Sequence, residues 1–400
     1  MSRSTFRLVP PVGAPLPVRT VLPSLREGAA GPQGLSDALT ERLGVRAPFF
    51  VSSGRAALAV LLQAMRQSSE RREVVLPAYT CFSVASAVAR AGLTIRLCDV
   101  DPTTLDLDFN ALVRLDLGKA LCIVPSGLYG LPGDLVGLEG LARGFGALVV
   151  DDAAQCLGAT QDGRPCGTFG DAGFYSLGRG KGITTMGGGI LVTRRPDLAR
   201  SIEEQMRALR RPSVGEVCAA VGGSLLYSGL LRPSRYWLVD RLPFLGLGGS
   251  YFDPAFPMAH LSVYQRRLAE QVLPLLDSYN KTRRDHADHL RSGLQGVEDI
   301  AIPRAVTGTS PVYLRFPILT RSEARRSHVL GRLRESGISA SASYPTAIGD
   351  IPGIAPYLAP DQKDCPAARS IATRILTLPT HPWVTARDVQ QMVAIVRKES

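Results

Sequence analysis

Short apolar runs alternate with longer stretches of helical periodicity over the first half of this chain. Short runs bounded by glycine, proline or acidic residues are typical of buried strands, whereas apolar residues on one face of a 3.6-residue repeat indicate a helix. The runs predict strands at 49–51, 74–77, 94–100, 120–125, 147–150, 174–176 and 189–193, and the periodic stretches predict helices at 36–43, 56–65, 135–143 and 196–211. This alternation favours the α/β class, with a mainly parallel sheet covered by helices on both faces.

The pattern changes in the second half of the chain. A long helical pattern at 259–294 contains Pro274, which predicts a kink or break because proline removes a backbone hydrogen bond. The elements expected after it are strands at 312–319 and 337–341 and helices at 325–335, 367–377 and 385–398. We therefore divide the chain into an irregular N-terminal arm with a short helix (1–45), a large domain (46–257) and a smaller C-terminal α+β domain that opens with an inter-domain helix (258–400).

The stretch 147–193 carries the candidate chemistry. Its first strand delivers Asp151 and Asp152 at its carboxyl end, and Lys181 follows in a glycine-bounded loop. Pyridoxal phosphate chemistry needs a lysine amine for the cofactor aldehyde and a carboxylate that keeps the pyridine nitrogen protonated. The alternatives are an Asp152 that caps a helix and a Lys181 that is an ordinary solvated loop residue. A P-loop is excluded because Gly182, rather than serine or threonine, follows the lysine.

The motifs around this lysine occur in a characteristic order. They are Asp-Asp-Ala-Ala-Gln-Cys-Leu-Gly-Ala (151–159), Gly-Thr-Phe-Gly-Asp-Ala-Gly-Phe-Tyr-Ser (167–176), Lys181 and Gly-Gly-Gly-Ile-Leu-Val-Thr (187–193). This order resembles the DegT/StrS-type sugar aminotransferases, which are fold-type I pyridoxal phosphate enzymes, and the likeness covers most of 45–398. It implies a mainly parallel, seven-stranded-type sheet. It also implies four roles: Lys181 as the Schiff-base lysine, Asp152 as the pyridine partner, Gln155 as a ring contact and Ser176 as a phosphate ligand.

Two strand-to-helix junctions supply further candidates. Residues 52–58 place backbone amides at a helix start, where anions bind. The resemblance implies that three residues here face the cofactor phosphate: Gly54, Arg55 and Ala56. At the second junction, 78–83, the position of the family's ring-stacking aromatic is Cys81, so either a sulfur contact from Cys81 or stacking by Phe82 replaces it.

Other positions depart from the family or bear on the substrate. Gly127 stands where the family often has histidine, and Ala-Phe-Pro-Met (255–258) replaces the Asn-x-Arg-Met tetrad that reaches a neighbouring subunit's phosphate. The candidate substrate contacts are Tyr129, Arg179, Tyr344 and His381. A lone histidine between prolines is more often a structural hydrogen-bonder than a proton shuttle.

The resemblance implies an aminotransferase that converts a keto sugar, nucleotide-linked in most relatives, to an amino sugar with a donor such as glutamate, in polysaccharide or glycoconjugate biosynthesis. It also implies a homodimer with the active site near the subunit interface. The alternatives are another fold-type I pyridoxal phosphate reaction and a non-catalytic scaffold or regulatory protein that has kept the fold. Lys181 argues against the deoxygenating relatives, which replace this lysine with histidine.

The amino-acid composition limits the kinds of binding partner that we expect. The chain has 46 lysine and arginine residues against 35 acidic ones, a formal net charge of +11, but no basic run interleaved with aromatics, so nucleic acid is not expected as a partner. Anionic substrates or an acidic membrane surface fit this balance better. The 7 cysteines show no spacing of a metal site or disulfide framework, which favours a cytoplasmic enzyme with reduced thiols and no metal. Neither a signal peptide nor a membrane-spanning run is expected.

Residues 212–257 form an apolar, glycine-rich insertion. Trp237 and Phe244 lie among leucines and arginines there, a combination that suits the membrane–water interface. Pro233 and Pro243 break the segment, so it is expected at most to lie on a membrane surface. The alternative is that its helices pack against the large domain or in a dimer interface.

Overall fold

A seven-stranded sheet forms the centre of the computed structural model, which describes residues 7–25, 32–240 and 251–398. The strands are β1 (Phe49–Val51), β2 (Glu73–Pro77), β3 (Thr94–Cys98), β4 (Ala120–Ile123), β5 (Leu148–Asp152), β8 (Ala172–Ser176) and β9 (Gly189–Thr193). Their order across the sheet is β1-β9-β8-β5-β4-β2-β3. The five strands from β8 to β3 are parallel, and β9 runs antiparallel to both of its neighbours. The predicted mainly parallel sheet is confirmed.

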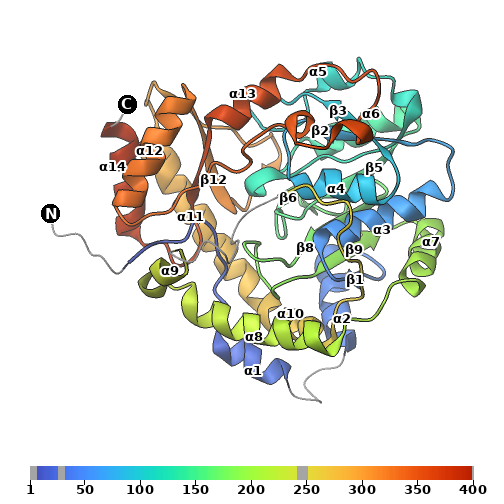
Figure 1. The fold of residues 1–400 in the computed structure, drawn as a ribbon, viewed down its shortest axis with the longest axis horizontal. Helices are drawn as coiled ribbons and strands as arrows, with labels where there is room; N and C mark the ends of the chain where they lie inside the picture. The colour runs from blue at the N-terminus through green and yellow to red at the C-terminus, as the bar shows by residue number, and fades with distance from the viewer. Residues whose placement is uncertain (1–6, 26–31, 241–250, 399–400) are drawn as a thin grey trace.

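Helices cover both faces of this sheet (Figure 1). They are α3 (Gly54–Arg66), α4 (Phe82–Arg90), α6 (Leu135–Phe145) and α7 (Pro196–Arg207), with the short α5 (Phe109–Leu112) beside them. Because successive side chains of a strand point to opposite faces, Val74 and Leu76 of β2 pack into one apolar cluster with α3 and α4. Val75, between them, packs into another cluster with α6. Burial on both faces explains why these strands are continuous apolar runs.

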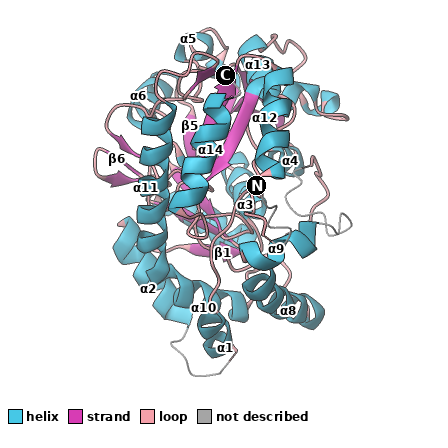
Figure 2. Cartoon of the chain, turned by 90° about the vertical axis from the view of Figure 1, so that its left-hand side faces the viewer, coloured by secondary structure: helices cyan, strands magenta, loops and turns pink. Residues whose placement is uncertain are grey.

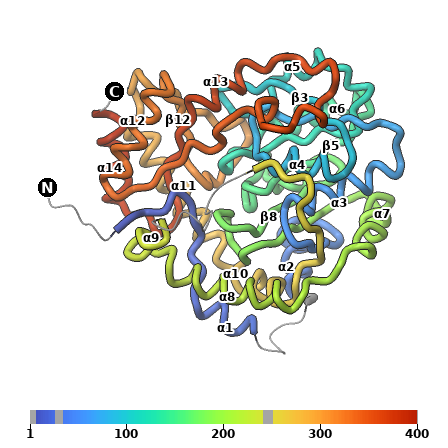
Figure 3. Tube along the Cα trace, in the orientation of Figure 1, coloured from blue at the N-terminus to red at the C-terminus, as the bar shows by residue number. Residues whose placement is uncertain are grey.

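The N-terminal arm is more ordered than the sequence predicts. It contains α1 (Val18–Ser24), which buries Val21 against α10, and α2 begins earlier than expected, at Pro32–Leu43. The irregular structure expected before the helix at 36–43 is therefore wrong over α1, because tertiary packing holds a helix that contains Pro23. The stretch that follows Arg7 runs beside α9 and α14 (Figure 3), and Arg7 pairs with Asp388 at 2.6 Å.

A second, antiparallel sheet lies in the C-terminal part, in the order β10 (Ile300–Ala301), β12 (Arg315–Thr320) and β13 (Ile375–Pro379). The helices near it are α11 (Leu276–Leu294), α12 (Glu323–Glu335), α13 (Pro366–Arg374) and α14 (Ala386–Lys398). A small third sheet joins β6 (Thr160–Gln161), β7 (Arg164–Pro165) and β11 (Thr309–Ser310). The break expected at Pro274 is confirmed, because α10 (Val263–Val272) and α11 are separated by a 3-10 turn at Leu273–Leu275. The domain boundaries stay predictions.

Two C-terminal expectations are wrong. The helix expected at 367–377 ends at Arg374, and 375–379 is the fully buried strand β13, because this apolar run finds a pairing partner in β12. The strand expected at 337–341 is absent from the described residues. Ile338 and Ser341 make only isolated bridges, to Val9 and Thr377.

The described part of the insertion contains two helices, α8 (Val214–Leu230) and α9 (Pro233–Asp240), bent by 119° at the break between them. Figures 1 and 2 show α8 lying alongside α1 and α10 at one end of the molecule. Residues 241–250, which include Phe244, lie outside the described part of the insertion. Among the described helices, none taken singly has both the length and the apolar composition needed to cross a membrane.

Candidate active site

Asp152 and Lys181 lie at the same edge of the large sheet. Asp152 ends β5, pairs in register with Phe174 of the adjacent strand β8, and is buried. Lys181 is in the loop that joins β8 to β9. The Asp152 carboxylate accepts a hydrogen bond from the Ala154 amide at 3.0 Å and one from the Ser126 hydroxyl at 3.4 Å. No helix begins at 153–159, so the helix-cap alternative for Asp152 does not hold.

Burial controls the charges of this pair. It raises the pKa of Asp152 to about 6. The Ala154 amide and the Lys181 charge oppose this shift, because both stabilise the ionised carboxylate. Burial also lowers the pKa of Lys181, and the nearby Cys81 and Asp152 oppose that shift. Since each group influences the other, the lysine amine and the carboxylate are electrostatic neighbours. A lysine in this environment differs from the solvated loop residue of the alternative interpretation.

Aromatic and amide side chains form a layer next to Cys81, which is within electrostatic range of Lys181. Gln155 links two of them: its Oε1 accepts a hydrogen bond from the Tyr129 amide at 3.2 Å, and its Nε2 donates to the Tyr344 hydroxyl at 3.4 Å. Tyr79 joins the layer, with its hydroxyl 3.1 Å from that of Tyr129 and donating to the Tyr344 carbonyl at 3.1 Å. Burial raises the pKa of all three tyrosines, so they are neutral hydrogen-bonding groups at neutral pH. The structure thus brings together the predicted Tyr129, Gln155 and Tyr344.

Tyr79 is the member of this layer that sequence reasoning passed over. It lies inside the 78–83 motif, in which only Cys81 and Phe82 were predicted to contact the cofactor ring. Cys81 is half-buried and within electrostatic range of Lys181 and Tyr344. Phe82 instead packs its ring against Tyr344, with centroids 5.8 Å apart. Of the two candidates, Cys81 is the one beside the lysine.

The start of α3 is where the sequence predicts an anion to bind. Ser53 caps the helix by accepting a hydrogen bond from the Ala56 amide at 3.2 Å, and the first-turn amides of Gly54 and Arg55 have no intrahelical acceptor. A Cβ on Gly54 would lie 2.8 Å from the Ser176 Cβ, so only glycine lets these two segments approach. The predicted Gly54, Ala56 and Ser176 are therefore brought together.

Three predicted side chains point elsewhere. The Arg55 guanidinium pairs with Asp253 at 3.5 Å and stacks on the Phe256 ring at 4.6 Å, so its charge is engaged by the end of the insertion. Arg179 is exposed and borders a separate hollow of about 310 Å³ beside the N-terminal half of α8. His381 is buried with its Nε2 2.8 Å from the Pro10 carbonyl, and burial lowers its pKa to about 4. It is placed as a structural hydrogen-bonder.

Gly127 is explained by its neighbour Cys156. The cysteine sulfur donates to the Gly127 carbonyl at 3.2 Å, and a Cβ on Gly127 would lie 2.3 Å from that sulfur. The space that a histidine would need at position 127 is filled by Cys156. In this chain, the absence of a side chain at position 127 is what accommodates the buried thiol.

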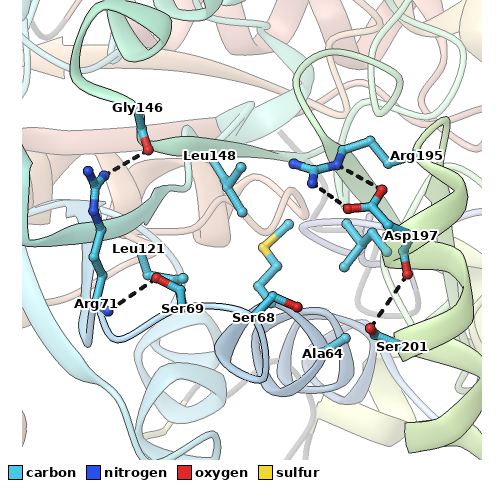
Figure 4. Close-up of a pocket in the computed structure, with 12 residues that line it drawn as sticks. Ala64, Ser68, Ser69, Arg71, Leu121, Gly146, Leu148, Arg195, Asp197 and Ser201 are labelled. Atoms are coloured by element: carbon cyan, nitrogen blue, oxygen red, sulfur yellow. Dashed lines mark hydrogen bonds and ion pairs between the residues drawn. The ribbon is translucent and has the colours of Figure 1, made fainter.

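A hollow of about 210 Å³ at the opposite edge of the sheet is not part of this site (Figure 4). It is bordered by the beginnings of β4 and β5, whereas ligands of such sheets bind at the carboxyl ends. Its charged groups are already engaged: Arg71 donates to the Gly146 carbonyl at 2.7 Å, and Arg195 pairs with Asp197 at 2.5 Å. We assign it no catalytic role.

The arrangement fits pyridoxal phosphate. A half-buried lysine amine, a buried carboxylate one strand away and a glycine-lined helix start are the groups that this cofactor requires. Over the described residues, no group of three or more histidine, cysteine or acidic side chains is placed to hold a metal ion.

Comparison with known proteins supports the conclusion that these residues fit pyridoxal phosphate. A model described as the DegT/DnrJ/EryC1/StrS aminotransferase family matches residues 25–221 and 261–397. The unmatched stretch between them overlaps most of the insertion. The chain is 28% identical over 350 residues to a UDP-N-acetyl-3-dehydro-alpha-D-glucosamine 3-aminotransferase of Acidithiobacillus ferrooxidans, with 87% of this chain and 82% of that protein covered. It is also 28% identical over 350 residues to the dTDP-3-amino-3,4,6-trideoxy-alpha-D-glucose transaminase of Streptomyces venezuelae, with 87% and 81% covered.

Among solved structures, Helicobacter pylori PseC, an aminotransferase involved in the biosynthesis of pseudoaminic acid, aligns with a TM-score of 0.79 at 17% identity. The alignment covers 98% of this chain and 99% of that one. At this identity the likeness shows the fold, which is that of the fold-type I aminotransferases.

Proposed function

Because the chain belongs to the DegT/DnrJ/EryC1/StrS aminotransferase family, whose members depend on pyridoxal phosphate, we propose that it converts a nucleotide-linked keto sugar to an amino sugar. An amino acid such as glutamate supplies the nitrogen. The two relatives named above carry names of nucleotide-sugar aminotransferases, which supports this substrate class. The observation that carries the proposal is the mutual influence of half-buried Lys181 and buried Asp152 at the carboxyl edge of the sheet.

Each residue of the pair has a defined task in this proposal. Bound pyridoxal phosphate supplies an aldehyde that reacts with amines and a ring that accepts an electron pair. Asp152, with a pKa of about 6, is ionised at pH 7 to 8 and holds the positive charge of the ring nitrogen. Lys181, whose pKa burial lowers, has an Nζ that can accept a proton from the α-carbon of the donor and return it.

The remaining groups hold and orient the cofactor and substrates. The amides of Gly54 and Arg55 and the hydroxyl of Ser176 meet the phosphate at the start of α3. We assign Gln155, which is hydrogen-bonded to Tyr344, to the cofactor ring, and Tyr344 to the substrate. We place the product in polysaccharide or glycoconjugate biosynthesis, since amino sugars are building blocks of those polymers.

The test is a transamination assay with candidate nucleotide keto sugars and L-glutamate, with the amino sugar detected by mass spectrometry. We expect turnover by the wild-type protein and none by Lys181→Ala. A protein that binds the cofactor and takes nitrogen from an amino acid but accepts no keto sugar would point to another fold-type I reaction. A protein that reacts with neither substrate class would favour the scaffold or regulatory alternative.

We further propose that the protein is a cytoplasmic homodimer, as the family resemblance implies. Sedimentation at working concentration is expected to give twice the mass of one chain, and an active monomer would refute the assignment. The contact that the Asn-x-Arg-Met tetrad is expected to provide in relatives either comes from other residues or is lost in this chain. Arg55 stands at the start of α3, but its guanidinium pairs with Asp253 of the same chain.

The insertion supports a proposal of peripheral membrane contact. The side chains of Leu226 on α8 and Leu22 on α1 are 63% and 54% exposed, and the two helices pack side by side. Three basic residues on these helices or just after them are exposed: Arg19 on α1, Arg232 after α8 and Arg235 on α9. Leucines flanked by arginines favour the surface of an anionic bilayer. The alternative occupant is a second copy of the chain.

A further inference from the structure

Arg283 is a buried cation that no carboxylate neutralises. It lies on α11, which runs from α10 towards α14 (Figure 1), and its side chain is fully buried. Burial lowers its pKa to about 10, and the charges that oppose this shift belong to Tyr227 and Tyr279. Within the described parts of the chain, no ion pair involves this guanidinium. Because a buried cation without an anion is costly, the groups that it bonds indicate its role.

This guanidinium bonds to the backbone of the loop that carries the lysine. Its Nη2 donates to the carbonyl of Gly182, the residue after Lys181, at 2.9 Å, and to the Gly13 carbonyl of the N-terminal arm at 3.3 Å. Over the described residues, the bond to Gly182 is the one hydrogen bond from another segment that reaches the backbone of 179–183. Gly180 and Gly182 flank the lysine and have no side chains to pack, so contacts from outside set the position of this loop.

The same face of α11 also holds the loop that follows Asp152. Asn280, one turn before Arg283, accepts a hydrogen bond from the guanidinium Nη1 at 2.9 Å, and its own Nδ2 donates to the Leu157 carbonyl at 2.9 Å. A Cβ on the next residue, Gly158, would lie 2.6 Å from that Nδ2, so only glycine permits this close approach. Three successive hydrogen bonds of 2.9 Å therefore connect the loop of the lysine with the loop of the carboxylate.

We propose that Arg283 is a positioning residue: through Asn280, it fixes the loop of Lys181 relative to the loop of Asp152. The inference rests on the proposed function, in which the lysine amine and the carboxylate serve the same cofactor ring. That chemistry needs the two groups at a constant separation. An arginine suits this task because its planar fork bonds several acceptors at once, and hydrogen bonds from a charged donor are stronger than those from a neutral one. An apolar side chain of similar volume would fill the space without connecting the loops.

The first measurement needs no cofactor. Backbone hydrogen exchange is compared in cofactor-free wild type, Arg283→Gln and Arg96→Gln, the last of which removes another buried arginine, on the edge strand β3. We expect Arg283→Gln to speed exchange in 153–159 and 177–188 by about tenfold or more, the effect of losing a hydrogen bond from a charged donor. Arg96→Gln should leave both loops within about twofold of wild type.

The second measurement follows the cofactor absorbance of loaded protein after mixing with L-glutamate, in the absence of sugar. For Arg283→Gln we expect the maximal rate to fall about 10- to 100-fold, because the lysine is displaced. The half-saturating glutamate concentration should stay within about threefold, because the change does not touch the groups that bind the donor. Arg283→Lys keeps the charge and should recover part of the rate. Asn280→Ala, which interrupts the same connection by a smaller change, should also lower the maximal rate, so the test does not depend on one variant folding.

Three outcomes would overturn the proposal. The first is wild-type exchange or a wild-type maximal rate in folded Arg283→Gln and Asn280→Ala. The second is an equal loss of rate in Arg283→Gln and Arg96→Gln, because the effect would then be one of overall stability. The third is a change confined to the half-saturating glutamate concentration. Wild-type protein that reacts with glutamate but accepts no sugar would sink the proposed function and leave the Arg283 result readable.

Discussion

At the residue scale, the site depends on charges held where water screens them poorly. Asp152 keeps one carboxylate oxygen on the Ala154 amide and the other near Ser126, yet burial still raises its pKa to about 6. The native state therefore binds a proton on this group more tightly than the unfolded chain does. The stability that Asp152 contributes is present below its ordinary pKa of 3.8 and is lost as the pH rises towards 6.

Replacing Asp152 by asparagine should separate stability from activity. At pH 8 the cofactor-free variant should be more stable than wild type by up to about 3 kcal/mol, and the difference should shrink at pH 4. The chemical step of the cofactor-loaded variant should slow by at least about 100-fold, because the ring nitrogen loses its counter-charge. Urea denaturation at both pH values and single-turnover kinetics measure the two effects, with exposed Asp162→Asn as the control. Near-normal transfer by Asp152→Asn would move the role to another carboxylate.

The pairing of Gly127 with Cys156 gives a second prediction. Gly127→Ala places a methyl group 2.3 Å from the Cys156 sulfur and should destabilise the protein by about 1 to 3 kcal/mol through overpacking. In the Cys156→Ala background the same change should cost much less, which a double-mutant cycle of unfolding free energies would show. Equal costs in both backgrounds would mean that the two residues do not share this space.

At the element scale, the sequence indicated the strands of the large sheet because both faces of each strand are buried, and it indicated the break at Pro274 because proline acts locally. Residues 375–379 were predicted as helix, but they form β13 because they pair with β12. That partner lies about 60 residues away along the chain, so local sequence does not reveal the pairing. Tyr79 was missed for the same reason. Its neighbours in the site, Tyr129 and Tyr344, come from segments remote in sequence, whereas Lys181 and Asp152 lie within one motif-rich stretch.

The cap of α3 is expected to matter for cofactor binding as well as for stability. Ser53→Ala removes the hydrogen bond to the Ala56 amide and should cost about 1 kcal/mol of unfolding free energy. Because this turn carries the phosphate-binding amides, cofactor affinity should fall as well. Ser213→Ala, which removes the equivalent cap of α8, is the matched control and should leave cofactor affinity unchanged. Equal cofactor affinity in both variants would show that the Ser53 cap does not contribute to cofactor binding.

At the scale of the whole molecule, the exposed leucines of α1 and α8 form the surface that we expect to contact either a membrane or a second copy of the chain. Wild-type protein should co-sediment with vesicles that contain anionic lipid, and less so at high salt. Leu22→Glu/Leu226→Glu should lose this binding while it keeps its activity and its dimer mass. Negligible vesicle binding by both proteins would refute membrane contact. A double variant that becomes monomeric would assign the face to a second copy of the chain.

The proposed function depends above all on Lys181 being the residue that binds the cofactor. Borohydride reduction of protein purified with pyridoxal phosphate, followed by peptide mass mapping, tests it directly. We expect a phosphopyridoxyl mass on the peptide that contains Lys181, and no labelled peptide from Lys181→Ala. A label on any other lysine of the wild-type protein, or none at all from protein saturated with the cofactor, would contradict it.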